Sequence, residues 1–272
     1  MRVIAETLGI FAGGYALLVG GLAMFQRDMI YHPGTQVVDP VEAGVPEMVP
    51  VPVRTSDGLS LTGWYAPPKD EDAATILLFH GNAGTLAHRA NKARTLMDAG
   101  YGVFLAGYRG YGGNPGRPSE DGLYADARAA LGWLAGSREV PLDRIALYGE
   151  SLGTGIAVQI ATEHPELAAL VLEAPFTRLP ELAPPFVLPG MADMLMVDRY
   201  DSLSKIDAVR PPLLILHGEQ DGVVPVAMGR RMLEAATGEK HGTFLPQAGH
   251  NDLWQLGAAE PVLEFLGRHA RS

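Results

Sequence analysis

The pattern of apolar and polar positions changes along the chain from a charge-free N-terminal run to a regular alternation of short and longer segments. Short apolar runs, each followed closely by Gly or Pro, cover residues 75–79, 102–106, 144–148, 169–173 and 213–216. Segments with helical spacing cover residues 85–99, 121–135, 152–163 and 226–236. Apolar runs of roughly 4–8 residues are too short for buried helices and are typical of strands buried on both faces.

Strands that alternate with helices at this rhythm are joined by crossover helices and therefore run parallel. We predict an α/β fold with a mostly parallel central sheet and helices on both of its faces. Residues 51–55 and 59–66 flank Ser56-Asp57-Gly58 with alternating apolar positions, which predicts an antiparallel hairpin before the parallel part. Ligands bind such sheets beyond the carboxyl ends of the strands, so we expect the functional residues in the loops that follow them.

The N-terminal run holds 20 residues without a charge between Glu6 and Arg27. At about 1.5 Å per helical residue this length matches the hydrocarbon core of a bilayer, and we predict a membrane anchor over residues 1–27. A signal segment cleaved near Gly21-Leu22-Ala23 and a buried core helix are the alternatives. The flanking charges place the N-terminus in the cytoplasm and the catalytic domain outside it.

The remaining chain divides into a linker and one folded domain. Residues 28–49 are rich in Pro, Val and Gly without helical period, which predicts an extended linker. Residues 50–272 are long enough for a single core. Residues 176–206 interrupt the strand–helix rhythm with several prolines and a Met-rich apolar patch. We predict a small lid over the site there, with a surface helix packed by its Met and Leu face as the alternative.

Composition and charge exclude several classes of function. The formal net charge is −10, with 31 acidic and 21 basic residues, and no basic stripe is present that could attract nucleic acid. The chain has no cysteine, which excludes disulfides, thiolate catalysis and zinc sites built on Cys. We expect no cofactor and no nucleic-acid partner, whereas the oligomeric state stays open.

The segment Gly149-Glu150-Ser151-Leu152-Gly153 matches the pattern G-x-S-x-G, directly after a predicted strand and directly before a predicted helix. A serine on such a sharp turn projects its hydroxyl above the sheet, while the following helix N-terminus favours negative charge nearby. This context predicts that Ser151 is a nucleophile. An ordinary glycine-rich turn is the alternative.

A serine hydroxyl needs a base to accept its proton, and the base needs a group that fixes its tautomer. His250 lies in a Gly-containing loop after a short strand at residues 243–245, and Asp221 follows the strand that ends near residue 216. We predict that His250 is the general base and that Asp221 orients it. The alternative is that both are solvated loop residues. Glu219 and Asp252 are rivals for the acid.

The tetrahedral intermediate of acyl transfer needs N–H donors for its oxyanion. We predict the backbone N–H groups of Leu152 and of Asn82, which lies in the loop His80-Gly81-Asn82-Ala83-Gly84 after a strand. This loop lacks the spacing and the lysine of nucleotide-binding motifs, so we discount nucleotide binding. We expect structural roles for His80 and His217, and for Arg109 as a hydrogen-bonding fork.

Several motifs together resemble a known family. They are His80-Gly81-Asn82-Ala83-Gly84, Tyr108-Arg109-Gly110-Tyr111-Gly112, Pro118-Ser119-Glu120-Asp121-Gly122-Leu123, Ser151-Leu152-Gly153 and Gly249-His250-Asn251-Asp252. This set, preceded by Gln26-Arg27-Asp28-Met29-Ile30-Tyr31, resembles the membrane-anchored serine hydrolases of the α/β-hydrolase superfamily, the branch that includes protein depalmitoylases.

The resemblance implies the α/β-hydrolase fold, a Ser-His-Asp triad and an N-terminal anchor. The chain departs from many relatives at Gly107, where they have Asp, and at Gly153-Thr154, where they have Gly-Gly. The eukaryotic depalmitoylases also carry an N-terminal Cys cluster that this chain lacks, so their substrate is not carried over.

These observations predict a serine hydrolase that cleaves a carboxylic ester or thioester through an acyl-enzyme. The predicted anchor and the apolar residues of the predicted lid favour a hydrophobic acyl group, and hence a small-molecule or lipid-like ester as substrate. A serine peptidase, an acyltransferase and a non-catalytic scaffold are the alternatives. A dehalogenase or an epoxide hydrolase would need Asp at the position of Ser151.

Overall fold

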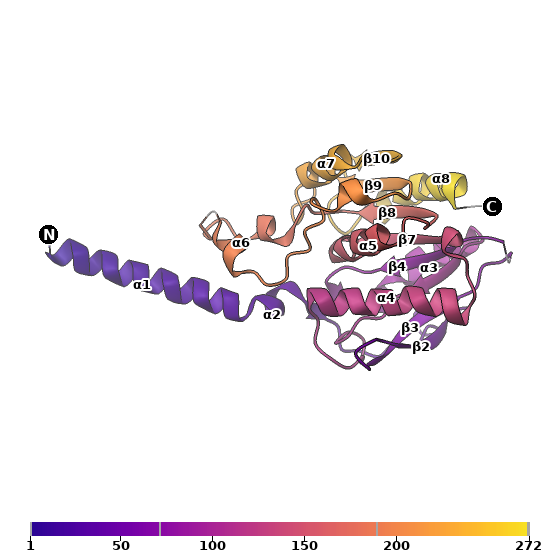
Figure 1. Cartoon of the computed structure of the whole chain (residues 1–272), viewed down its shortest axis with the longest axis horizontal. Helices are drawn as coiled ribbons and strands as arrows, with labels where there is room; N and C mark the ends of the chain where they lie inside the picture. Colours follow the sequence, from indigo (N-terminus) through magenta and orange to yellow (C-terminus); the bar gives the residue numbers. More distant parts are fainter. Residues whose placement is uncertain (1, 71, 189, 271–272) are drawn as a thin grey trace.

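The central feature of the molecule is one sheet of eight strands (Figure 1). The computed structural model describes residues 2–70, 72–188 and 190–270. The strands, in their order across the sheet, are β10 (Lys240–Leu245), β9 (Leu213–Gly218), β8 (Ala169–Glu173), β7 (Ile145–Glu150), β4 (Thr75–Phe79), β6 (Gly102–Leu105), β3 (Ser60–Ala66) and β2 (Val49–Arg54). Only the pairs β2–β3 and β3–β6 are antiparallel, which confirms the predicted mostly parallel sheet.

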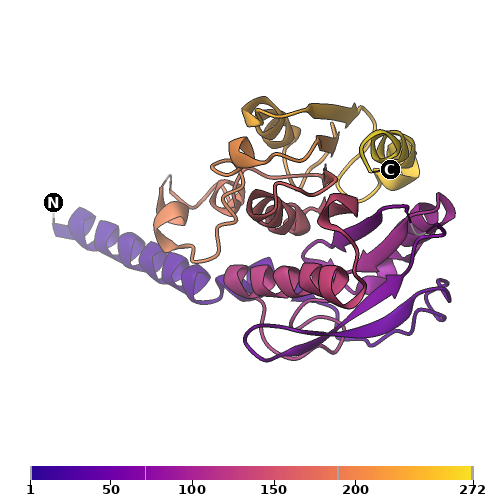
Figure 2. The same cartoon turned by 45° about the vertical axis from the view of Figure 1, so that its right-hand side comes forward.

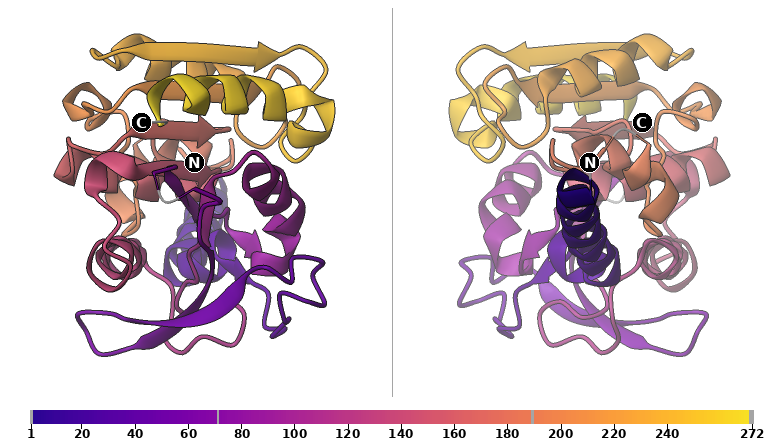
Figure 3. Two further views of the ribbon diagram at one scale, coloured as in Figure 1. Left: turned by 90° about the vertical axis from the view of Figure 1, so that its right-hand side faces the viewer. Right: turned by 90° about the vertical axis from the view of Figure 1, so that its left-hand side faces the viewer.

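Helices cover both faces of this sheet, as the sequence predicts (Figure 3). On one face lie α4 (Glu120–Ser137), α5 (Leu152–Glu163) and α7 (Val226–Ala235); on the other lie α3 (Ala90–Asp98) and α8 (Ala259–His269). Alternate residues of a strand point to opposite faces, so Leu77 and Phe79 pack in the first layer and Ile76 and Leu78 in the second. The whole of β4 is therefore buried.

Short elements connect these layers. They are α2 (Gln26–Ile30), β1 (His32–Pro33), β5 (Ala83–Gly84), η1 (Leu86–Arg89), η2 (Leu142–Arg144), η3 (Leu179–Leu182), α6 (Met191–Leu195), η4 (Ile206–Ala208) and the π-helical turn η5 (Trp254–Ala258). The strand β1 pairs in parallel with β5, so the predicted linker is hydrogen-bonded to the loop that follows β4. The predicted helix over residues 85–99 is divided into η1 and α3.

The N-terminal helix α1 (Arg2–Met24) extends away from the body of the molecule (Figures 1 and 2). No helix in the described ranges is long and apolar enough to cross a membrane. The predicted single span over residues 1–27, and with it the membrane-anchored location, is therefore wrong. Five of the 23 residues of α1 are glycine and contribute no apolar side chain. Tyr15 of α1 instead hydrogen-bonds the backbone of Phe186 and Leu188.

A buried polar cluster holds the chain after α1 against residues 176–206, which we call the insertion. Arg27 donates two hydrogen bonds to Asp198, over 2.9 and 3.1 Å. The Tyr31 hydroxyl lies 3.0 Å from Asp198 Oδ2 and 2.9 Å from the Tyr200 hydroxyl. Asp198 and both tyrosines are buried. Because an unpaired buried carboxylate is costly, this cluster fixes residues 27–31 beside the end of the insertion.

Candidate active site

Ser151 lies on the sharp turn between β7 and α5, with φ +51° and ψ −115°. This conformation is rare for a residue with a side chain and needs support from its surroundings. The backbone N–H of Ser151 donates to the Glu173 carbonyl over 2.9 Å, and the Ser151 carbonyl accepts from the Thr154 N–H and hydroxyl over 2.9 and 2.6 Å. The turn therefore holds the Ser151 hydroxyl beyond the carboxyl end of the sheet.

Gly153 lets the first turn of α5 approach β4 closely, and we expect Gly153→Ala to destabilise the fold. A Cβ at this position would lie 2.0 Å from the Phe79 carbonyl oxygen. Overpacking of this kind costs about 1–3 kcal/mol or more, so urea denaturation should give a lower free energy of unfolding. Gly132→Ala, in α4 with nothing within 4 Å of the new Cβ, should be neutral or stabilising. Equal effects of the two substitutions would refute this explanation.

The structure brings Ser151, His250 and Asp221 into one line of hydrogen bonds. His250 Nε2 lies 2.9 Å from Ser151 Oγ, and His250 Nδ1 lies 2.7 Å from Asp221 Oδ2. Both separations are within hydrogen-bonding range. Ser151 follows β7, Asp221 follows β9 and His250 follows β10. The loops at the carboxyl ends of these three parallel strands therefore meet here. The arrangement can deprotonate a serine hydroxyl and hold the imidazole in one tautomer.

Asp221 is held as a carboxylate by several donors. Its Oδ1 accepts the backbone N–H groups of Val223 and Val224, each over 2.8 Å. His217 Nε2 lies 2.9 Å from the Val224 carbonyl oxygen and 3.4 Å from Asp221 Oδ2. Burial alone would raise the pKa of Asp221, but the hydrogen bonds from His217, His250 and the backbone outweigh it and hold the pKa well below its usual range. Asp221 thus stays ionised opposite the imidazole.

The two residues predicted to supply the oxyanion donors, Leu152 and Asn82, line the same cavity as Ser151. Leu152 is the first residue of α5, and the first N–H groups of a helix have no intrahelical acceptor. The Asn82 loop lies against the nucleophile, because a Cβ on Gly81 would be 3.4 Å from Ser151 Cβ. The Asn82 carbonyl accepts from the His32 N–H over 2.9 Å and from the Tyr111 hydroxyl over 2.8 Å. These contacts fix the loop in place.

The other candidate residues have partners of their own in the structure. His80 is buried against Tyr108, with ring centroids 4.0 Å apart, and burial lowers its pKa to about 3. Arg109 donates to Asp126 and Asp57 through its guanidinium, so it is a structural fork. The rival acids are paired elsewhere: Glu219 lies 2.5 Å from Arg230, and Asp252 accepts the Gly249 N–H over 2.7 Å.

A charged network behind the nucleophile was not predicted. Glu150, directly before Ser151, accepts from Arg89 over 2.8 and 3.2 Å and lies 3.5 Å from Lys92 Nζ. Lys92 also donates to Glu173, which accepts from the Tyr148 hydroxyl as well. Burial alone would raise the pKa of Glu150, but the charges of Lys92 and Arg89 lower it to about 2. Lys92 lies in a predicted helix, and nothing in the sequence around it indicates that its side chain contacts Glu150 and Glu173.

We expect Lys92→Met to lower the free energy of unfolding by about 3–5 kcal/mol, because it leaves the Glu173 carboxylate buried without its cation. Chemical denaturation measures this loss. Lys69→Met is the matched control, since Lys69 is exposed and the one hydrogen bond described for its side chain goes to the carbonyl of Asp98. It should change the free energy by less than about 0.5 kcal/mol. If Lys92→Met lowers the free energy of unfolding by less than about 1 kcal/mol, as ordinary surface substitutions do, the expectation is wrong.

A cavity of about 340 Å³ opens beside the Ser151 hydroxyl. Its wall comes from the N-terminal segment, the insertion and the loops around the triad, and its side chains are almost all apolar. Val19 and Leu22 of α1, Leu179 of η3 and Met191 of α6 line it. Gln26, Asn82 and Ser151 are its polar residues in the described part of the chain, and none of its described residues is charged. The sequence did not predict that α1 forms part of this wall.

Comparison with known proteins shows the family of this chain. Residues 70–201 match the family model described as serine aminopeptidase, S33. The chain is 30% identical to the alpha/beta hydrolase domain-containing protein WAV2 of Arabidopsis thaliana, over 96% of this chain and 92% of that protein. The chain therefore belongs to the α/β-hydrolase family and is a hydrolase. An uncharacterized protein of Mycobacterium tuberculosis is 42% identical over 87% of this chain and 86% of its own length.

Solved structures show the same fold. An esterase of Pyrococcus furiosus superposes with a TM-score of 0.69 at 21% identity, over 88% of this chain and 99% of that chain. The esterase domain of a Rhodothermus marinus protein gives a TM-score of 0.63 at 24% identity, over 82% of this chain and 98% of that chain. Likeness at this level of identity establishes the architecture, whereas the reaction has to be argued from the site.

Proposed function

We propose that this chain is a serine hydrolase that cleaves carboxylic esters or thioesters with a hydrophobic acyl group. The proposal rests on the 2.9 Å separation between His250 Nε2 and Ser151 Oγ, because a general base must reach the proton that it removes. Asp221, bound to the other ring nitrogen, supports this role by keeping Nδ1 protonated and Nε2 free to accept.

The proposed reaction has two halves. Ser151 Oγ attacks the carbonyl carbon while His250 takes its proton, and the N–H groups of Leu152 and Asn82 stabilise the oxyanion. His250 then protonates the leaving alcohol or thiol, which leaves an acyl-enzyme on Ser151. Water then attacks the acyl-enzyme while His250 takes its proton, and His250 returns this proton to Ser151 Oγ as the carboxylic acid leaves, which restores the serine and the neutral imidazole. The positive end of α5 favours the oxyanion further.

The wall of the cavity supports a hydrophobic acyl group. A volume of about 340 Å³ lies within the usual range of ligand pockets, roughly 300–1,000 Å³. Burying one methylene group contributes about 0.8 kcal/mol, which corresponds to about fourfold in affinity. With a series of p-nitrophenyl esters, KM should therefore fall about fourfold per added methylene until the cavity is filled.

Substitution in the wall tests the same proposal. Val19 is buried in the cavity wall, whereas Leu17, on the same helix, is exposed. We expect Val19→Trp to lower kcat/KM for a decanoyl ester by at least about 10-fold, because the indole fills space that the acyl chain would occupy, and to leave acetyl ester hydrolysis unchanged. Leu17→Trp should change neither. Equal losses on both esters in Val19→Trp would mean that the acyl chain lies elsewhere.

The peptidase alternative is less consistent with the cavity. An aminopeptidase must hold a charged α-amino group, and a buried ammonium needs an opposite charge or several acceptors. The described residues of the cavity wall include no carboxylate. Hydrolysis of aminoacyl p-nitroanilides should accordingly be far slower than hydrolysis of matched acyl esters by the full chain.

A further inference from the structure

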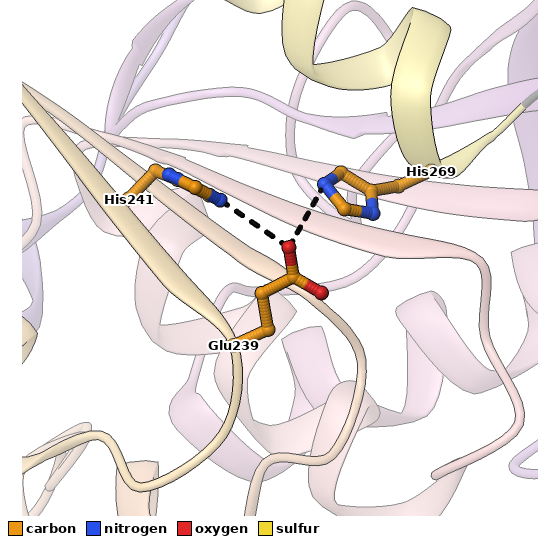
Figure 4. A group of neighbouring side chains, drawn as sticks. All are labelled: Glu239, His241 and His269. Atoms are coloured by element: carbon orange, nitrogen blue, oxygen red, sulfur yellow. Dashed lines mark hydrogen bonds and ion pairs between the residues drawn. The ribbon is translucent and has the colours of Figure 1, made fainter.

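Three potential metal ligands lie together at the edge of the sheet, away from the triad (Figure 4). Glu239 directly precedes β10, His241 is the second residue of β10, and His269 is the last residue of α8. They gather at the amino end of β10. The triad lies beyond the carboxyl ends of the parallel strands, so the two groups are at opposite ends of the sheet.

Two of the distances within this group fit a tetrahedral ion. Glu239 Oε1 lies 3.4 Å from His241 Nε2 and 3.4 Å from His269 Nε2, and the ligand atoms all lie within 4.8 Å of one another. Zn²⁺ binds His nitrogen and carboxylate oxygen at about 2.0–2.2 Å, so two such ligands at a tetrahedral angle are about 3.3–3.5 Å apart. Both separations from Glu239 Oε1 match this value. They are long for a hydrogen bond between the same atoms.

His269 Nε2 carries a second indication. This nitrogen is buried and has no hydrogen-bond partner among the described residues, although it points toward the Glu239 carboxylate (Figure 4). Buried ring nitrogens are normally satisfied, so an unpaired one in a group of ligands suggests a missing partner. A metal ion between the three side chains would satisfy it.

The rings of both histidines are already held by packing. Phe265 of α8 is buried, with its ring centroid 4.7 Å from that of His269 and 5.9 Å from that of His241. Little side-chain freedom would be lost on binding, which favours affinity. Two imidazoles and one carboxylate are also a ligand set that suits Zn²⁺.

We propose that Glu239, His241 and His269 bind one Zn²⁺ ion, with water as the fourth ligand. The ion would join the edge strand β10 to the C-terminal helix α8 and so act as a structural clamp. This site is independent of the proposed esterase reaction, because none of its ligands contacts Ser151, His250 or Asp221 among the interactions described.

Zinc titration of the EDTA-treated full chain, in competition with a chromophoric chelator, tests the proposal. We expect one equivalent bound with a Kd in the micromolar range or tighter. The melting temperature should rise by about 5 °C at a free zinc concentration near 100 times Kd. Each of His269→Gln and Glu239→Gln should weaken binding at least about 100-fold, since even the loss of a supporting partner costs 10–100-fold.

His164→Gln is the matched control. His164 lies 3.3 Å from Glu166 in an exposed pair that lacks a second histidine, so this variant should retain the zinc affinity of the parent chain. Ser151→Ala should also retain it. Circular dichroism without zinc shows whether each variant is folded, and the exposed Glu239 makes Glu239→Gln the safer of the two ligand changes. No stoichiometric binding by the parent chain, or unchanged binding in folded Glu239→Gln, would overturn the proposal.

Discussion

Replacing Ser151 with alanine is expected to lower kcat for ester hydrolysis by about 10⁴–10⁶-fold while leaving the fold intact. The reason is that the substitution removes the only atom in the line of hydrogen bonds that can form the acyl-enzyme. The turn itself is held by backbone contacts to Glu173 and Thr154, which alanine keeps. A steady-state assay with a p-nitrophenyl ester and a melting curve measure the two effects separately.

Labelling by a fluorophosphonate completes this test. The probe should modify the parent chain at Ser151 and should not modify Ser151→Ala. Ser137→Ala serves as control, because Ser137 is exposed at the end of α4 and should leave both activity and labelling unchanged. If Ser151→Ala retains more than a tenth of the activity, another group performs the reaction and the proposed function fails.

Asp221→Asn is expected to lower kcat by about 10⁴-fold, although the side chain keeps its shape. The amide oxygen can still accept from Val223 and Val224, so the loop should stay folded. The amide nitrogen, however, would donate toward His250 Nδ1, which forces the ring proton onto Nε2. His250 would then face Ser151 with a donor instead of an acceptor and could not remove the hydroxyl proton.

The double variant separates this explanation from a general loss of structure. Residues that act as one unit show strongly non-additive losses, so Asp221→Asn combined with Ser151→Ala should be no slower than Ser151→Ala alone. Glu219→Gln, whose carboxylate pairs with Arg230 and not with His250, should retain nearly full activity. Additive losses in the double variant would mean that Asp221 acts independently of the serine.

The parallel sheet was predictable because its strands leave a simple pattern. A strand buried on both faces is apolar over most of its length, and β4 and β8 have the bounds that their apolar runs predict. The helix α8 was missed, because its Pro261 and the preceding Gly257 suggest a loop when the chain is considered alone. In the structure the turn η5 contains Gly257 at φ +102° and leads directly into α8.

The position of the candidate triad could be predicted for a related reason. Parallel strands deliver the loops at their carboxyl ends to one edge, so Ser151, Asp221 and His250 were expected to meet although they are far apart in the sequence. Their catalytic use stays a prediction until the variants are measured. The network of Lys92 and Glu173 had no comparable signal, because a contact between the side of a helix and a strand end has no fixed sequence spacing.

The N-terminal prediction failed because hydropathy does not report what an apolar residue faces. A run of residues that could contact lipid can equally line a cavity, as Val19 and Leu22 do here. The five glycines in α1 lower its apolar surface further. Only the three-dimensional position of the helix beside the insertion distinguishes these cases.

The origin of the cavity wall has a consequence for how this enzyme can change during evolution. Ser151, Asp221 and His250 are carried by the strand ends, whereas most of the wall comes from α1 and the insertion. Mutations in those two segments can therefore alter which esters are accepted while the reactive groups keep their geometry. The two segments also contact each other through the Tyr15 hydroxyl and the backbone of Phe186 and Leu188, so compatible pairs of mutations would have to arise together. To engineer a new ester specificity, α1 and the insertion should therefore be exchanged together.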